Sequence, residues 1–150
     1  MKLTSAAFAQ EGLIPSRYTC DGSNVSPALS FEEVPAGTAS LALICDDPDA
    51  PFGTWVHWVY YDLPGDTAGL PEDVPLEKSP SSGGTQGNND FGQIGYGGPC
   101  PPGGTHRYFF KLYALDTMLD LPPGASKGQL LGRMKGHILA EAELMAQYGR

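Results

Sequence analysis

Three carboxylates and two prolines occur together in the segment DDPDAP, residues 46–51. Pro48 and Pro51 fix the backbone at their own positions and restrict the residues before them, so Asp47 and Asp49 are expected in a rigid turn. Carboxylates this close repel one another unless a proton, a metal ion or a cationic group intervenes. The segment therefore predicts positive charge nearby. The alternative is that single aspartates only cap the turn through their side chains.

Two histidines and a loop rich in glycine and proline extend this candidate site. His57 lies in the apolar segment after DDPDAP, where the alternative is an ordinary core histidine. His106 comes two residues after the loop GQIGYGGPCPPGG, residues 92–104, whose glycines allow backbone N–H groups to approach a ligand. If the aspartates and both histidines converge, the carboxylates would raise the pKa of each imidazole and hold it as a donor. Such a pocket would recognise a small anion.

Other chemistries are less well supported by the residue pattern. Aspartate and histidine are suitable ligands for zinc or iron, but no HxH or HxxxH pair is present, so we expect no metal and no cofactor. The chain has no GxSxG motif, and nothing around Cys100 predicts a depressed thiol pKa. A metal-assisted or acid–base hydrolase that uses the same Asp and His set remains the alternative.

Composition and charge narrow the classes of function. The 150 residues fit a single domain, 1–150, and 20 Gly with 14 Pro exclude a protein dominated by long helices. The formal net charge is −8, and no cation lies between Arg17 and Lys78 or from residue 79 to residue 106. Nucleic acids and anionic bilayers require clustered cations, so we expect neither as a partner.

Location and cysteine state are also predicted from the sequence. No apolar stretch is long enough to span a membrane and the first residues lack an apolar signal core, so we expect no stable membrane insertion and a cytoplasmic location. The chain has an odd number of cysteines, Cys20, Cys45 and Cys100, and none of them form a CxxC motif. Free thiols are therefore expected, with the pairing of two of them left open.

The elements that would position these residues are mostly strands. Short runs of β-branched and aromatic residues, with Gly and Pro at their edges, predict strands over 2–8, 28–31, 41–46, 55–63 and 108–115. One substantial helix is predicted over 127–147, because Ser126 and Gln129 form a capping-box pattern and apolar residues then recur every three or four positions. We expect this helix to lie across a β-sheet.

Six motifs occur in a fixed order along the chain: YTCDG (18–22), SPALSF (26–31), DDPDAP (46–51), TWVHWVYYDLP (54–64), GYGGPCPP (95–102) and HRYFFKLYALD (106–116). Together they resemble the phosphatidylethanolamine-binding protein family, and most closely its bacterial and archaeal branch, which is similar to Raf kinase inhibitor protein. The resemblance extends from about Thr4 to the predicted C-terminal helix.

The resemblance implies a mainly β fold: a β-sandwich with a central antiparallel sheet, Pro/Gly-rich loops and a C-terminal helix. It also implies a pocket for phosphate or a phosphorylated head group and a cis peptide bond at Ala50–Pro51. The ligand-binding residues that it implies are Asp47, Asp49, His57, Gly98, Pro99, Pro102, His106 and Tyr108.

The function expected from this resemblance is non-enzymatic binding of a small anionic or phosphorylated ligand. A protein partner, a kinase or a protease, and a homodimer are expected as further partners. An inhibitor of a protease or kinase that acts through its surface is a second alternative, beside the hydrolase.

Overall fold

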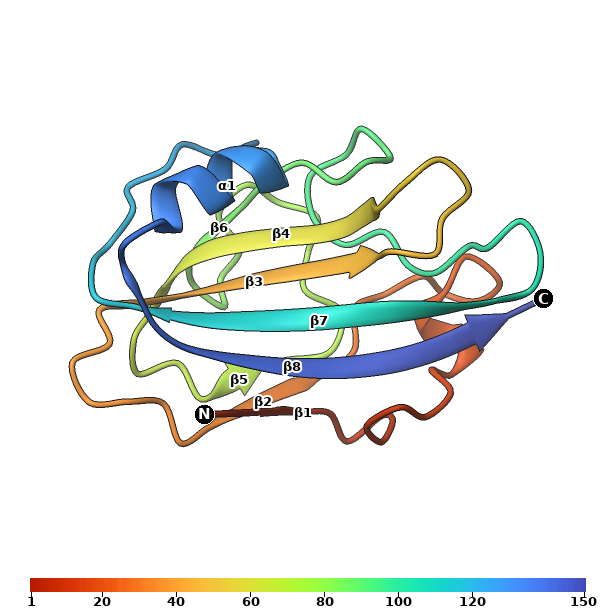
Figure 1. Ribbon diagram of the computed structural model, residues 1–150, viewed down its shortest axis with the longest axis horizontal. Coiled ribbons are helices and arrows are strands. Elements are labelled where there is room, and N and C mark those ends of the chain that lie inside the picture. The colour runs from red at the N-terminus through yellow and green to blue at the C-terminus, as the bar shows by residue number, and fades with distance from the viewer.

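The computed structural model describes residues 1–150 and consists of two antiparallel sheets and one short helix (Figure 1). The larger sheet has the strand order β6-β4-β3-β7-β8, and the smaller one has the order β1-β2-β5. The strands are β1 (Lys2–Thr4), β2 (Leu29–Glu32), β3 (Ser40–Asp47), β4 (Trp55–Pro64), β5 (Gly69–Leu70), β6 (Thr85–Gln86), β7 (Thr105–Leu115) and β8 (Ile138–Gly149); the helices are α1 (Lys127–Met134) and the 3-10 helix η1 (Ser16–Tyr18).

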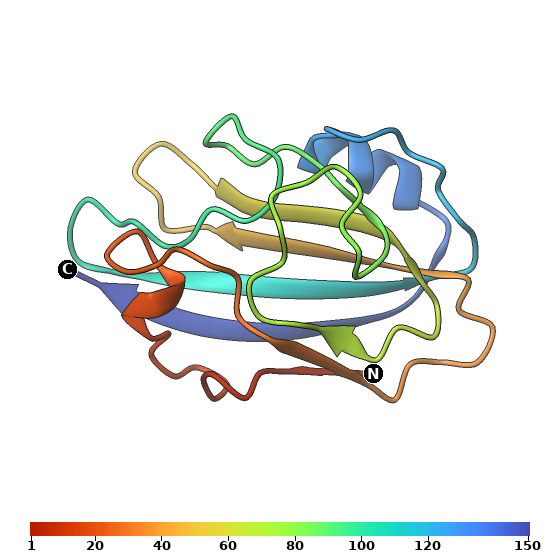
Figure 2. The same ribbon diagram turned by 180° about the vertical axis from the view of Figure 1, so that it is seen from behind.

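The five-stranded sheet is covered on both faces. One face packs against the smaller sheet and the long connections around it, which lie in front of the sheet in Figure 2, and this side holds a core of 20 buried residues. The other face packs against α1 through a second core of 10 buried residues. All eight residues of β3 are buried, because Leu41 and Leu43 face the first core while Ala42 and Ile44 face the second.

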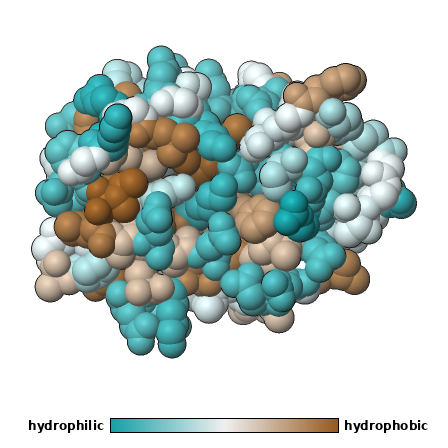
Figure 3. Space-filling view, viewed as in Figure 1, coloured by the Kyte–Doolittle hydropathy of each residue, from teal (hydrophilic) through white to brown (hydrophobic).

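The expected fold class is confirmed: the protein is mainly β, with a central antiparallel sheet and a helix near the C-terminus. Each predicted strand is present, although β1 ends at Thr4 rather than residue 8. Apolar side chains that stay exposed gather over α1 and the start of β8 (Figure 3), and include Leu131, Ile138 and Leu139. No helix in the structure combines the length and the apolar character that crossing a bilayer requires.

The predicted extent of the C-terminal helix is wrong. The capping box of Ser126 and Gln129 is present, but α1 ends at Met134, and β8 then pairs with β7 along its whole length. Gly136, at a φ of 83°, takes a left-handed conformation between the two elements. Residues four apart lie on one face of a helix, and they also lie on one face of a strand, where side chains alternate. The spacing of the apolar residues therefore did not distinguish a helix from a strand.

Two further expectations are wrong. Cys20 and Cys100 form a disulfide, although they lie 80 residues apart in the chain, and only the buried Cys45 is a free thiol. The fold brings the turn after η1 against the loop before β7, and this proximity has no signature in the cysteine spacing. No cis peptide bond is present, so the bond between Ala50 and Pro51 is trans, the form that proline intrinsically favours.

Candidate functional site

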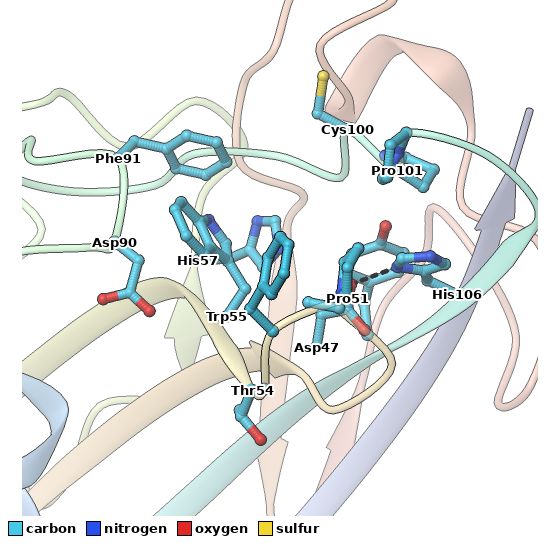
Figure 4. Close-up of a pocket in the computed structure, with 15 residues that line it drawn as sticks. Asp47, Pro51, Thr54, Trp55, His57, Asp90, Phe91, Cys100, Pro101 and His106 are labelled. Atoms are coloured by element: carbon cyan, nitrogen blue, oxygen red, sulfur yellow. Dashed lines mark hydrogen bonds and ion pairs between the residues drawn. The ribbon is translucent and has the colours of Figure 1, made fainter.

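A pocket of about 520 Å³ lies at the edge of the large sheet where β3 ends and β4 and β7 begin. Antiparallel pairing of β3 with both neighbours brings these three strand ends together. The β3–β4 turn forms one wall, and the loop before β7 forms the opposite wall (Figure 4). Of the eight residues expected to bind a ligand, five line this pocket: Asp47, His57, Pro102, His106 and Tyr108.

A β-bulge in β4 directs His57 into the pocket. Cys45 of β3 pairs with Trp58 and Asp46 pairs with Val56, so His57 between them has no partner across the ladder. A bulge of this kind re-aims a side chain that strict alternation would send to the other face. The imidazole consequently lies edge-on to the ring of Tyr108, with the two ring centroids 5.2 Å apart.

The hydrogen bonding of His57 fixes its tautomer. Its Nδ1 lies 2.6 Å from the carbonyl oxygen of Gly97, and because a carbonyl only accepts, Nδ1 carries the proton. The Gly97 N–H in turn donates to the His57 carbonyl at 2.9 Å. The Nε2 atom has no hydrogen-bond partner in the chain, so it is available to a ligand in the pocket.

Burial decides the charge of His57. The side chain is only 3% exposed, and this burial lowers its pKa below the ordinary value, against the opposing influence of the Gly97 carbonyl and the Asp47 carboxylate. The expectation that the carboxylates raise the histidine pKa is therefore wrong for His57. Near neutral pH its ring is uncharged, and Nε2 presents a lone pair to the pocket.

His106 is held by the carboxylate of Asp47. Its Nδ1 donates to Asp47 Oδ2 at 2.7 Å, and the other oxygen of Asp47 accepts the N–H of Asp49 at 2.7 Å. Both side chains are almost completely buried, so the pair is shielded from solvent. The carboxylate fixes the orientation of the ring and leaves Nε2 of His106 free of any partner in the chain (Figure 4).

Tyr108 supplies a buried hydroxyl without a partner. Its ring stacks on His106 at 6.4 Å between centroids, and its hydroxyl is the one buried side-chain polar atom with no hydrogen bond. Burial, with a smaller contribution from the Asp47 carboxylate, raises the pKa of this hydroxyl, so it remains a neutral donor. An unpaired buried donor costs about 1–3 kcal/mol, and a ligand atom that accepts from it would recover that cost.

Asp49 does not line the pocket, because Arg107 binds it. The guanidinium donates to both carboxylate oxygens at 2.9 and 2.8 Å, and the Arg107 N–H adds a third bond at 3.0 Å. These bonds lower the pKa of Asp49 to about 2. The positive groups predicted from the three carboxylates are thus present, since Asp46 is likewise paired with Lys111 and Lys127, at 3.2 and 2.7 Å.

Gly98 and Pro99 also lie outside the pocket lining and instead fix the loop that forms its wall. The N–H of Gly98 donates to the side chain of Asn24 at 2.8 Å, and the Pro99 carbonyl accepts from the N–H of Cys20 at 3.1 Å. A Cβ at Gly98 would stand 2.2 Å from the carbonyl oxygen of Tyr18. Glycine is needed here for close approach to the neighbouring backbone, not for contact with a ligand.

The rim of the pocket was missed by reasoning from the sequence. Trp55 and Phe91 meet edge-to-face across it, with ring centroids 5.5 Å apart, and the side chain of Phe52 is fully exposed at the tip of the β3–β4 turn. Asp90 accepts the N–H of Val56 at 2.7 Å and so holds the loop against β4. The available signal was the presence of aromatic residues in loops, which indicates order or contact with a ligand but does not say which.

The assembled site combines polar groups with an aromatic rim. Tyr108, His57 and His106, which carry one unpaired hydroxyl and two unpaired imidazole nitrogens, line a cavity bordered by aromatic and proline side chains. No group of three His, Cys, Asp or Glu side chains is arranged to hold a metal ion. The arrangement suits a small oxygen-rich group that can both accept and donate hydrogen bonds.

Comparison with known proteins gives consistent results over the whole chain. Residues 4–149 match the family described as phosphatidylethanolamine-binding protein. A UPF0098 protein of Methanothermobacter thermautotrophicus is 58% identical over 150 residues, which cover 100% of this chain and 99% of the relative. A UPF0098 protein of Aquifex aeolicus is 53% identical over 154 residues, which cover 100% and 89%.

Two crystal structures are closely similar in fold. The phosphatidylethanolamine-binding protein homologue CT736 of Chlamydia trachomatis superposes with a TM-score of 0.91 at 44% identity, covering 99% of this chain and 97% of that one. YbcL of E. coli, described as a member of the mammalian PEBP family, gives a TM-score of 0.91 at 34% identity, covering 99% and 98%. These neighbours have the same two-sheet architecture as the present chain.

Proposed function

Because the chain belongs to the phosphatidylethanolamine-binding protein family, we propose that it is a non-enzymatic binding protein whose pocket takes phosphate or a phosphorylated head group. Family membership supports a binding-protein fold. The observation that carries the finer proposal is the unpaired hydroxyl of Tyr108, buried beside two imidazoles whose Nε2 atoms have no partner. A phosphoryl group has several oxygens in one place and can satisfy all three.

Each polar group has a defined part in this proposal. Tyr108 donates its hydroxyl to one phosphoryl oxygen, and His106, when protonated, donates Nε2–H to another. Asp47 holds the far side of the His106 ring, so the carboxylate is paired rather than placed directly against the anion. The bound anion therefore meets a histidine ring whose position is held by a buried carboxylate.

His57 adds a preference for a protonated oxyanion. Its ring is neutral near pH 7, since burial lowers its pKa, and Nε2 then accepts a hydrogen bond. A phosphate monoester, whose second pKa is about 6, can carry a P–OH that donates to this nitrogen. Sulfate has no such proton at neutral pH. We therefore expect phosphate to bind more tightly than sulfate, and its affinity to fall as pH rises from 5 to 8.

The binding test uses isothermal titration with inorganic phosphate and with phosphorylethanolamine. Tyr108→Phe removes only the hydroxyl, and we expect the affinity to fall at least about tenfold, because a hydrogen bond to a charged group contributes about 1.5–3 kcal/mol. His106→Gln removes the imidazole ring and should weaken binding at least as much.

His137→Gln is the matched control for the His106 variant. His137 also pairs with a carboxylate, Asp116, at 2.8 Å, but it is half exposed and lies far from the pocket lining. We expect this variant to bind phosphate as the parent does. Equal affinity of parent, Tyr108→Phe and His106→Gln for both ligands would refute the proposed function.

The acid–base hydrolase remains an alternative because of one observation, the carboxylate-held imidazole of His106. A histidine oriented by a buried carboxylate is also the arrangement of a general base. Release of p-nitrophenol from p-nitrophenyl phosphate, lost in Asp47→Asn and retained in His137→Gln, would favour the enzyme. Binding without turnover would favour the binding protein.

The partners and the location expected from the sequence stay predictions. A kinase or protease partner is tested by capture on the immobilised chain and by competition with phosphate, and a homodimer is tested by sedimentation velocity. The cytoplasmic location, expected from the absence of an apolar span and of a signal core, is tested by cell fractionation. Disulfides such as Cys20–Cys100 are rare in that compartment.

A further inference from the structure

The Cys20–Cys100 disulfide lies at the border of the pocket and not in the protein core. Cys100 is exposed and lines the pocket, whereas Cys20 is half-buried in the turn after η1. In Figure 4 the Cys100 side chain stands at the upper edge of the pocket, beside Pro101. Because Cys100 is the more exposed residue of the two, we expect a nucleophile in solvent to reach its sulfur more readily than that of Cys20.

A cation lies against both sulfurs. The guanidinium of Arg150 donates to Cys20 Sγ at 3.3 Å and approaches Cys100 Sγ at 3.9 Å. The carboxylate of Asp21 holds the guanidinium, and the backbone N–H of Arg150 binds the carbonyl of Gly104, so the cation is fixed in place. A neighbouring cation stabilises a thiolate, and an acidic thiol is a better leaving group in disulfide exchange.

We propose that the Cys20–Cys100 disulfide is an exchange site for a dithiol reductant and that its opening releases residues 100–103, which include the pocket-lining residues Pro101 and Pro102. Cys100, the more exposed residue, receives the attack at its sulfur, and the half-buried Cys20, whose sulfur is nearer Arg150, is the leaving group. The function of the bond is then to couple the redox state of the chain to the shape of the pocket.

The exchange proceeds in two balanced steps. A thiolate of the dithiol attacks Cys100 Sγ, a mixed disulfide forms, and the electron pair of the broken bond passes to Cys20 Sγ beside Arg150. The second thiolate of the reductant then attacks its own sulfur in the mixed disulfide and releases Cys100. The reductant leaves as a disulfide, and its two thiol protons account for the two cysteine thiols produced.

The contacts of the loop define which part is released. Gly98 and Pro99 stay attached through Asn24 and the N–H of Cys20, which do not depend on the disulfide. Beyond them, residues 101–103 have no backbone hydrogen bond, and residue 104 is held through Arg150. Reduction therefore leaves the start of the wall in place and frees the part that carries Pro101 and Pro102.

The first experiment counts thiols in the folded full-length chain. After treatment with dithiothreitol without denaturant, we expect alkylation of two cysteines, whereas buried Cys45 reacts only in urea. The variant Cys45→Ala should show the same two alkylated cysteines. Resistance of the disulfide to dithiothreitol in the folded chain would overturn the proposal.

The second experiment tests the role of Arg150. Replacement by glutamine should slow the reduction about threefold or more, because the leaving thiolate loses its cation, and Arg150→Lys should restore most of the rate. Lys2→Gln, a neutralisation distant from the disulfide, should leave the rate unchanged. Equal rates for Arg150→Gln and the parent would refute the assigned role of the cation.

The third experiment follows the pocket without any ligand. Trp55 lines the pocket and is 39% exposed, whereas Trp58 is fully buried, so acrylamide quenching of tryptophan fluorescence reports on Trp55. We expect more quenching after reduction, and the same increase in the double variant Cys20→Ser/Cys100→Ser without reductant. Unchanged quenching in both would overturn the coupling to the pocket. Because no ligand is needed, this result is independent of whether phosphate binds.

Discussion

Replacement of Tyr108 by phenylalanine should stabilise the unliganded protein, although it removes a polar group from the candidate site. Tyr108 is 1% exposed and its hydroxyl has no partner, so the folded chain bears a desolvation cost of about 1–3 kcal/mol for that group. The phenyl ring keeps its packing against His106 and His57. If about 1 kcal/mol is recovered, the Tm of a chain of this size rises by about 2–4 °C.

Calorimetry of parent and variant in phosphate-free buffer measures this shift, and Tyr96→Phe is the matched control. The Tyr96 hydroxyl is also buried, but it donates to the Tyr18 carbonyl at 2.7 Å, so its loss should destabilise the chain by about 0.5–1.5 kcal/mol. With phosphate at saturation the parent should gain more stability than Tyr108→Phe. A lower Tm for Tyr108→Phe, similar to that of Tyr96→Phe, would refute the reasoning that the Tyr108 hydroxyl is unpaired.

Three further changes test the surroundings of the pocket. The pKa of Asp49 is depressed to about 2, so the ionised Asp49 stabilises the fold fully above the pKa of an unfolded aspartate, near 4. This stabilisation is lost as pH falls toward 2, and Arg107→Gln should abolish this part of the acid dependence of Tm. Burial lowers the pKa of His57, so stability should decline as pH falls below about 6.5, the unfolded value, and urea midpoints for His57→Gln should lack that decline. Gly98→Ala, whose Cβ would stand 2.2 Å from the Tyr18 carbonyl oxygen, should lower the unfolding free energy by about 1–3 kcal/mol; an unchanged urea midpoint would contradict the packing described here.

Local pattern was sufficient for five of the eight strands, and five of the eight expected site residues line the pocket. Asp47 and His106 follow from residue type and from their positions at the end of one strand and the start of another, and antiparallel neighbours bring such ends together. Asp49 has the same chemistry two residues after Asp47, yet it turns toward Arg107. Which of two nearby carboxylates faces a pocket depends on the turn conformation and on a cation from another strand, and neither is encoded locally.

The other wrong predictions concern contacts between distant segments and a spacing of apolar residues that fits both a helix and a strand. An apolar spacing of four predicts the same positions for a helix and for one face of a strand, and only the long ladder with β7 decides in favour of β8. The disulfide joins segments 80 residues apart, so no local pattern could indicate it. Burial reversed the expected pKa direction for His57, because the depth of a side chain depends on the loops that pack over it.

Because of the bulge at His57, the site depends on the number of residues in β4 as much as on their identity. Cys45 opposes Trp58 while Asp46 opposes Val56, so one additional residue in β4 exchanges inward and outward positions from His57 toward the β3–β4 turn. A homologous chain that lacks one residue here could keep every aspartate, histidine and tyrosine and still turn its histidine toward the helix-covered face. Alignments of such chains should therefore be judged by the number of residues between the DPDAP turn and the second tryptophan, as well as by the letters that match.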